Sequence, residues 1–257
     1  MRLNYRLPTF EYMLDTVCRT AAGEGSGLPV SRGLLADTLF QYYPRLNKQE
    51  LTDLPHEQLC DYIAEELGEV YGSSMRQLGD RAAEWQVYWD KNTAGVCAAF
   101  EEIFDISLER KLQRLTGNIT LNPITGSDRQ KQTYDLFWMN SARGACGISL
   151  HEISHMVWFM KWHEHFGDAP ELYCAPDLRW VFSEMVTEAI LSHPVLAPLN
   201  PYRGRTCPEY FNAVRIEGQP LLAHIDRLYR ENDIVGFMEQ GFRFCIDNER
   251  VIRSVVC

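Results

Sequence analysis

The chain has 257 residues, of which 46% are hydrophobic, and a formal net charge of −10. Its length and composition are those of a globular protein with one large domain or two small ones. The acidic balance argues against a nucleic-acid surface or an anionic membrane as the main partner, because both bind clustered lysine and arginine side chains. No window approaches the about 20 apolar residues that a bilayer-spanning helix needs, and the N-terminus lacks the apolar core of a signal peptide. We therefore expect a soluble, cytoplasmic protein that binds neither nucleic acid nor membrane.

Eight cysteines are scattered singly along the chain, and no two of them form a CxxC pair. This spacing does not support a zinc ribbon or a thioredoxin-like site. In a chain without an export signal we expect reduced and mostly buried thiols.

Residues 1–105 are expected to be mostly helical. Apolar residues recur every three to four positions over residues 9–21, 30–43 and 56–71. A glycine-rich breaker run at 22–29 follows the first of these segments, and a turn-like stretch at Asp53–Pro55 precedes the third. The next segment, residues 73–104, is long enough for one interrupted helix or for two.

The pattern changes between Leu115 and Asn140. Residues 116–127, TGNITLNPITGS, alternate β-branched with polar side chains, and residues 132–139, QTYDLFWM, form an aromatic-rich run. Both segments are strand candidates. Pro123 predicts that the first is an edge strand, since proline cannot donate to a ladder.

Helical patterns return from Ala145 to the end of the chain, with a loop at residues 200–204. Together the segments predict an α+β fold that is mainly helical and contains a small sheet. We expect a helical N-terminal region of residues 1–105 and a second region of residues 106–257, or one continuous domain.

The most informative motif is HEISH, residues 151–155. Two histidines four positions apart lie one turn above each other on a helix, so His151 and His155 can present two imidazole nitrogens to one ion. Glu152 is rotated by about 100° and can sit beside that ion as a general base. Apolar residues cover nearly every face of this helix, so that its polar groups would be buried and would need a ligand or partner.

A third metal ligand has to come from elsewhere in the chain. His163 lies eight residues beyond His155, about 12 Å along the helix axis, and is out of reach. The segment SEMVTE, residues 183–188, places Glu184 and Glu188 one turn apart on a mainly apolar helix. Glu184 would complete a two-histidine, one-glutamate ligand set with an open fourth position, which is typical of catalytic zinc. Glu188 could accept the Nδ1 hydrogen of a ligand histidine.

HEISH followed by SEMVTE resembles the gluzincin branch of the zincin metallopeptidases, whose pattern is HExxH followed on a second helix by NExxSD. The resemblance covers about Leu115 to His193. It implies a zincin-like domain in residues 106–257, Zn²⁺ ligands at His151, His155 and Glu184, a general base at Glu152 and a supporting acid at Glu188. In this chain Ser183 stands in place of the usual Asn, and Glu188 in place of Asp. In such peptidases the edge strand of a small sheet binds the substrate backbone, and residues 116–124 occupy the corresponding place.

Two other interpretations remain open. A di-iron carboxylate bundle uses Glu-x-x-His, the spacing of Glu152 and His155, but such bundles need a second copy of the motif, and the sequence has none. A catalytically inactive zincin-like protein, or a helical binding or scaffold protein, would use the HEISH residues structurally.

The favoured interpretation is a zinc-dependent peptidase that hydrolyses peptide bonds with a metal-activated water. Its substrate would be a peptide or a protein. A further side chain should stabilise the oxyanion, and the sequence spacing does not select it among four candidates: Tyr202, Tyr210, Arg215 and His224. Cleavage specificity and oligomeric state have no signal in the sequence.

Overall fold

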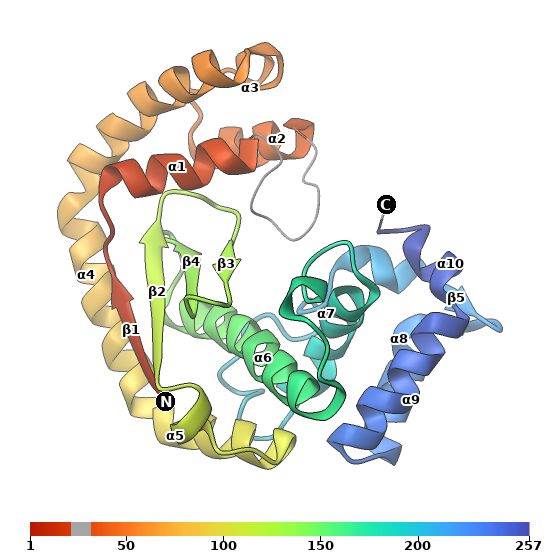
Figure 1. The fold of residues 1–257 in the computed structure, drawn as a ribbon. Helices are drawn as coiled ribbons and strands as arrows, with labels where there is room; N and C mark the ends of the chain where they lie inside the picture. Colours follow the sequence, from red (N-terminus) through yellow and green to blue (C-terminus); the bar gives the residue numbers. More distant parts are fainter. Residues whose placement is uncertain (22–31, 257) are drawn as a thin grey trace. The chain divides into compact units, whose positions relative to one another are not determined.

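The computed structural model describes residues 1–21 and 32–256 (Figure 1). The chain forms two compact units, which we call unit 1 (Met1, Asn92–Gln113 and Cys146–Cys257) and unit 2 (Arg2–Lys91 and Arg114–Ala145). Two helices run from one unit into the other, so neither unit is a continuous piece of chain. The bounds of these units differ from the division expected after residue 105. That division stays a prediction.

Unit 2 contains a four-stranded mixed sheet with the strand order β1-β2-β4-β3. Its strands β1 (Arg2–Arg6), β2 (Arg114–Thr120) and β4 (Thr133–Phe137) are parallel, and β3 (Ser127–Asp128) pairs antiparallel with β4. The sheet and the many helices confirm the predicted α+β class. Both strand candidates are confirmed as β2 and β4, whereas β1 was not expected. Its signal is the alternation of buried Leu3 and Tyr5 with exposed neighbours over only five residues.

The prediction that residues 116–124 form an edge strand is wrong. β2 pairs with β1 from Arg114 to Asn118 and with β4 from Thr116 to Thr120, so it lies inside the sheet. The strand ends at Thr120, and Pro123 therefore lies beyond the ladder and removes no hydrogen bond from it.

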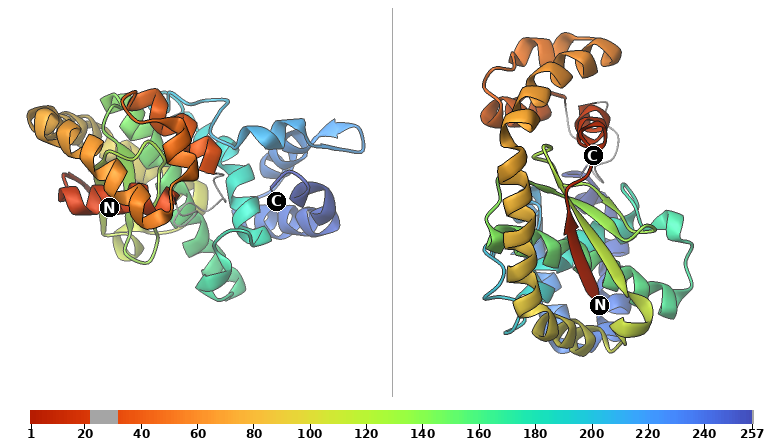
Figure 2. Two further views of the ribbon diagram at one scale, coloured as in Figure 1. Left: turned by 90° about the horizontal axis from the view of Figure 1, so that it is seen from above. Right: turned by 90° about the vertical axis from the view of Figure 1, so that its left-hand side faces the viewer.

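The outer edge of β1 is covered by a helix. The Gln86 side chain on α4 accepts a hydrogen bond from the Tyr5 backbone N–H at 3.0 Å and donates one to the Leu3 carbonyl at 3.0 Å. Figure 2 shows α4 running alongside this strand. These bonds satisfy backbone groups that would otherwise offer a template for another strand.

The helices of unit 2 are α1 (Phe10–Ala21), α2 (Arg32–Tyr42), α3 (Lys48–Asp53) and the first part of α4 (His56–Phe104). The breaker run at 22–29 lies outside the described residues. α4 is one helix of 49 residues, in place of the separate helices expected over 56–71 and 73–104. Gly72 and Gly79 have open space around them and stay helical, each at a cost of about 1 kcal/mol that buried apolar neighbours offset.

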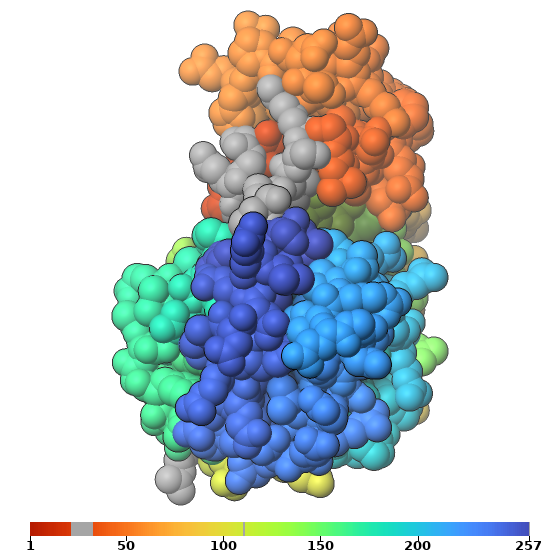
Figure 3. Space-filling model, turned by 90° about the vertical axis from the view of Figure 1, so that its right-hand side faces the viewer, coloured from red at the N-terminus to blue at the C-terminus, as the bar shows by residue number. Residues whose placement is uncertain are grey.

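Unit 1 contains the end of α4 and the remaining helices, of which α6 begins in unit 2. They are α5 (Leu108–Lys111), α6 (Ala142–Phe166), α7 (Leu178–Leu191), α8 (Leu221–Glu231), α9 (Ile234–Asp247) and α10 (Glu249–Arg253), with the short 3-10 helices η1 (Pro170–Leu172) and η2 (Glu209–Ala213) and the hairpin of β5 (Arg215–Ile216) and β6 (Gln219–Pro220). α8 and α9 lie side by side on the face of this unit seen in Figure 3. The loop expected at 200–204 is confirmed.

In the described part of the chain, no helix combines the length and the apolar character that crossing a bilayer requires.

Candidate metal centre

The HEISH segment lies in the middle of α6, which has clear signals at both ends. Ser141 precedes the helix, and its hydroxyl accepts a hydrogen bond from the Gly144 N–H at 3.0 Å, as an N-cap does. The helix ends at Phe166 because Gly167 adopts φ 68° and donates its N–H to the His163 carbonyl. His163 and His165 lie in the last turn.

The SEMVTE segment lies on α7, the second helix of the site. Asp177 caps it by accepting the Arg179 N–H at 2.8 Å. Every residue of α7 except Arg179 and Glu188 is buried. A helix with this burial must pack on several sides, which fixes the direction in which Glu184 points.

Aromatic side chains hold α6 against α7. Trp158 of α6 meets Phe182 of α7 edge to face, with ring centroids 5.2 Å apart. Phe237 of α9 packs against both rings, at 5.9 Å and 5.5 Å. Trp158 lies three positions beyond His155, and Phe182 two positions before Glu184, so this cluster sets the spacing of the two helices next to the ligand residues.

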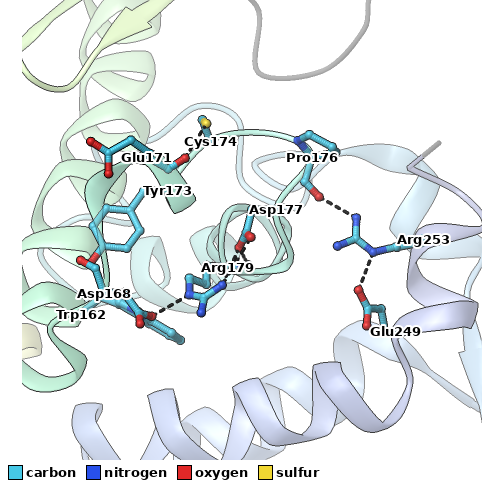
Figure 4. A network of polar contacts seen from close by, with 10 residues as sticks. All are labelled: Trp162, Asp168, Glu171, Tyr173, Cys174, Pro176, Asp177, Arg179, Glu249 and Arg253. Atoms are coloured by element: carbon cyan, nitrogen blue, oxygen red, sulfur yellow. Dashed lines mark hydrogen bonds and ion pairs between the residues drawn. The ribbon is translucent and has the colours of Figure 1, made fainter.

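The connection between α6 and α7 is held by a second set of contacts, drawn in Figure 4. The Asp168 carboxylate accepts hydrogen bonds from the Trp162 indole N–H at 3.0 Å and from Arg179 Nε at 2.6 Å. Arg179 also donates to Asp177. Arg253 of α10 donates to the Pro176 carbonyl at 2.6 Å. The loop thus links the end of α6 to the start of α7 through the ion pair of Asp168 and Arg179.

Three side chains converge between the two helices. His155 Nε2 lies 3.0 Å from His151 Nε2 and 3.2 Å from Glu184 Oε1, and His151 Nε2 lies 3.8 Å from Glu184 Oε2. Ligand atoms placed tetrahedrally at about 2.05 Å from a zinc ion are roughly 3.3 Å apart. The donor set and its spacing therefore fit a Zn²⁺ ion with little movement. Among the described residues, these three are the group of His, Cys, Asp and Glu side chains close enough together to hold a metal ion.

The surroundings favour the neutral form of His151. Burial lowers the pKa of His151, and His155 lowers it further, against the opposing effects of Glu184 and Glu152. His155 is 5% exposed and Glu184 8% exposed. Since metal binds the neutral form of histidine, this depressed pKa prepares the site for an ion at neutral pH.

Glu152 is next to this group and is itself buried. Its charge raises the pKa of His151, the preceding residue. The role of Glu152 as a general base stays a prediction.

The chain segment of residues 200–211 passes close to both helices. A Cβ at Gly147 would lie 2.6 Å from the Pro201 ring, so the segment touches α6 one turn before His151. The segment then reaches α7, where the Glu188 carboxylate accepts the Gly204 N–H at 2.8 Å and the Thr206 N–H at 3.3 Å. Sequence reasoning missed these contacts because they join residues far apart in the chain.

This segment also supplies Cys207 and Tyr210. Burial and the charges of Glu184 and Glu188 raise the pKa of the Cys207 thiol. Burial, together with the charges of Glu184 and Cys207, raises the pKa of Tyr210. The Tyr210 hydroxyl is buried, and it makes no hydrogen bond within the described ranges. A buried donor of this kind, next to a candidate metal ligand, can donate a hydrogen bond to a bound molecule.

The four candidate oxyanion donors have different surroundings in the structure. Tyr210 lies close enough to Glu184 for the two charges to interact, and Tyr202 lies against Gly147. His224 faces the Ile216 carbonyl at 3.1 Å and stacks on Phe244. Arg215 is exposed in β5. Among the four, Tyr210 is the candidate whose pKa responds to the charge of a candidate ligand residue.

The described contacts of Glu188 differ from the expected ones. Both oxygens of its carboxylate accept backbone N–H groups of the 200–211 segment. Support of a ligand histidine by Glu188 stays a prediction, while the contacts described here give it the role of an anchor for that segment.

The chain was also compared with known proteins. No family model, no curated protein and no solved structure matches it.

Proposed function

We propose that the chain is a zinc-dependent peptidase of gluzincin type, acting on peptides or proteins in the cytoplasm. The observation that carries this proposal is the convergence of His151, His155 and Glu184 from two helices into one ligand set. The HEISH and SEMVTE motifs, which resemble those of gluzincins, lie on the two helices that supply these ligands.

Zinc is the ion that suits two imidazoles and one carboxylate best, because these ligands are typical of catalytic zinc and leave one position open. When bound, the ion would polarise the substrate carbonyl and make a water molecule more acidic.

Glu152 would take a proton from that water and later return it to the amine that leaves. Glu152 is buried and directly follows His151 in the chain. Tyr210 would donate its buried hydroxyl to the oxyanion that develops at the substrate carbonyl. Glu188 would hold the segment that carries Tyr210.

The experiment that tests this proposal compares the wild-type chain with the Glu152→Gln variant. Both proteins are loaded with zinc and incubated with a pool of peptides, and cleavage is followed by mass spectrometry. We expect both to hold zinc and only the wild type to cleave. Equal cleavage by both proteins would remove Glu152 from the mechanism, and no cleavage by the zinc-loaded wild type would contradict the proposed activity.

A second candidate function is a catalytically inactive zincin-like or helical binding protein. It is favoured by the same distances, because 3.0 Å between the histidine nitrogens and 3.2 Å from His155 to Glu184 are also hydrogen-bond distances. In that case the three side chains satisfy one another without an ion. Failure of the purified protein to take up zinc would favour this second function.

A further inference from the structure

Two arginines stand together in the segment of residues 200–211. Arg203 and Arg205 are exposed and flank Gly204. Neither forms an ion pair with any residue in the described part of the chain. The chain carries 35 acidic and 25 basic residues, and these two arginines place two positive charges within one turn.

The backbone between these arginines is held next to the candidate metal centre. The Gly204 N–H is bound to Glu188, which lies one turn, about 6 Å along α7, beyond Glu184. The Arg205 N–H donates to the Tyr202 carbonyl at 2.8 Å, which closes a turn. Tyr202 rests against α6 at Gly147. The turn is therefore fixed on both helices that carry the ligand residues.

We propose that Arg203 and Arg205 bind a carboxylate of the peptide substrate. The inference rests on the proposed peptidase function and names its substrate class: peptides with a carboxylate a short distance from the scissile bond. A guanidinium offers paired N–H donors that match the two oxygens of a carboxylate. The carboxylate is either the C-terminus of a short peptide or an acidic side chain.

In an acidic chain, a local positive charge favours the binding of this substrate class. An anionic peptide is repelled by a protein of net charge −10 and approaches best where positive charge is concentrated. Next to the centre, Glu184 and Glu152 add negative charge on the helices. The two arginines are the basic groups that the same anchored turn supplies.

The test uses three pools of N-terminally labelled hexapeptides. The first pool has a free C-terminus and no acidic side chains, the second is the same with an amidated C-terminus, and the third is amidated and contains one glutamate. Wild type, an Arg203→Gln/Arg205→Gln double variant and an Arg243→Gln control are loaded with zinc. Arg243 is an exposed arginine on α9, away from the anchored turn.

We expect the wild type and the control to cleave the first or the third pool about 10- to 100-fold faster than the second, the range that a hydrogen bond to a charged group supports. Preference for the first pool identifies the C-terminus as the source of the carboxylate, and preference for the third identifies a side chain. The double variant should keep its zinc and lose the preference. Equal cleavage of all three pools by the wild type, or an unchanged preference in the double variant, would overturn the inference.

Binding separates this inference from the proposed activity. If the wild type cleaves no pool, the peptidase proposal fails, and fluorescence anisotropy of the same pools still tests the arginines. The zinc-loaded Glu152→Gln protein should bind a carboxylate pool more tightly than the amidated one by about 10-fold, again as expected for one bond to a charged group. Equal binding of the three pools would overturn the carboxylate site itself.

Discussion

Glu188 provides a prediction that separates two roles for one side chain. Replacement of Glu188 by Ala removes both hydrogen bonds that hold the 200–211 segment, from Gly204 at 2.8 Å and from Thr206 at 3.3 Å. Bonds to a charged acceptor are each worth about 1.5–3 kcal/mol at most. Glu188 is half-buried, and the second bond is long, so solvent screening lowers the total to about 2 kcal/mol.

The assay for this prediction has two readouts. Thermal unfolding should show a Tm lower by about 4–8 °C, since about 2–4 °C is expected per kcal/mol for a chain near this size. Zinc affinity, measured by competition with a chromophoric chelator, should change by less than about 3-fold, because an anchor of the segment is not needed to orient a ligand histidine.

Two further variants serve as controls. Glu188→Gln keeps one carbonyl acceptor, so its loss of stability should be about half of that expected for Glu188→Ala. Glu209→Gln changes an exposed glutamate in η2 and should leave both readouts unchanged. The reasoning would be refuted if Glu188→Ala unfolded at the wild-type temperature, or if its zinc affinity fell by about 10- to 100-fold, the effect of losing support for a ligand histidine.

The remaining predictions concern four other residues. Gly147→Ala should destabilise the protein by about 1–3 kcal/mol in urea unfolding, because its Cβ would meet the Pro201 ring at 2.6 Å; Gly79→Ala, with open space around it, should stabilise by up to about 1 kcal/mol. Tyr210→Phe should keep zinc and stability but lower kcat about 100-fold or more, as loss of an oxyanion donor does, and an unchanged kcat would exclude Tyr210 from this role. His151 has a lowered pKa in the folded protein, so below about pH 6.5 the unfolded chain binds a proton that the folded chain does not. The free energy of unfolding of the metal-free protein should therefore fall from pH 7 to pH 5. The free energy of unfolding of the His151→Gln variant should fall less steeply over the same range.

The helices of the site could be predicted from the sequence because their signals are local. Apolar spacing predicts helices from Ala145 onward, and α6 and α7 lie in this part of the chain. The pairing of His151 and His155 follows from helix geometry alone. The convergence of Glu184 on them was an expectation drawn from ligand chemistry, and the structure places its carboxylate 3.2 Å from His155.

The features that could not be predicted depend on contacts between distant residues. Pro123 suggested an edge strand, but the position of β2 is set by its pairing with β1, more than 100 residues earlier. The close approach of Pro201 to Gly147 has no local signal, because each residue alone indicates only a loop or a weak helix position. The same holds for Tyr210, which no spacing relates to Glu184.

The ligand set itself is tested most directly by the zinc content of the purified protein. Wild-type protein reconstituted with zinc and then dialysed is analysed by atomic emission, alongside Glu184→Ala and the Glu209→Gln control. The account predicts about one equivalent of zinc in the wild type and in the control, and much weaker retention in Glu184→Ala. Less than about a tenth of an equivalent in the reconstituted wild type, or equal retention by Glu184→Ala, would contradict the assignment of His151, His155 and Glu184 as a zinc site.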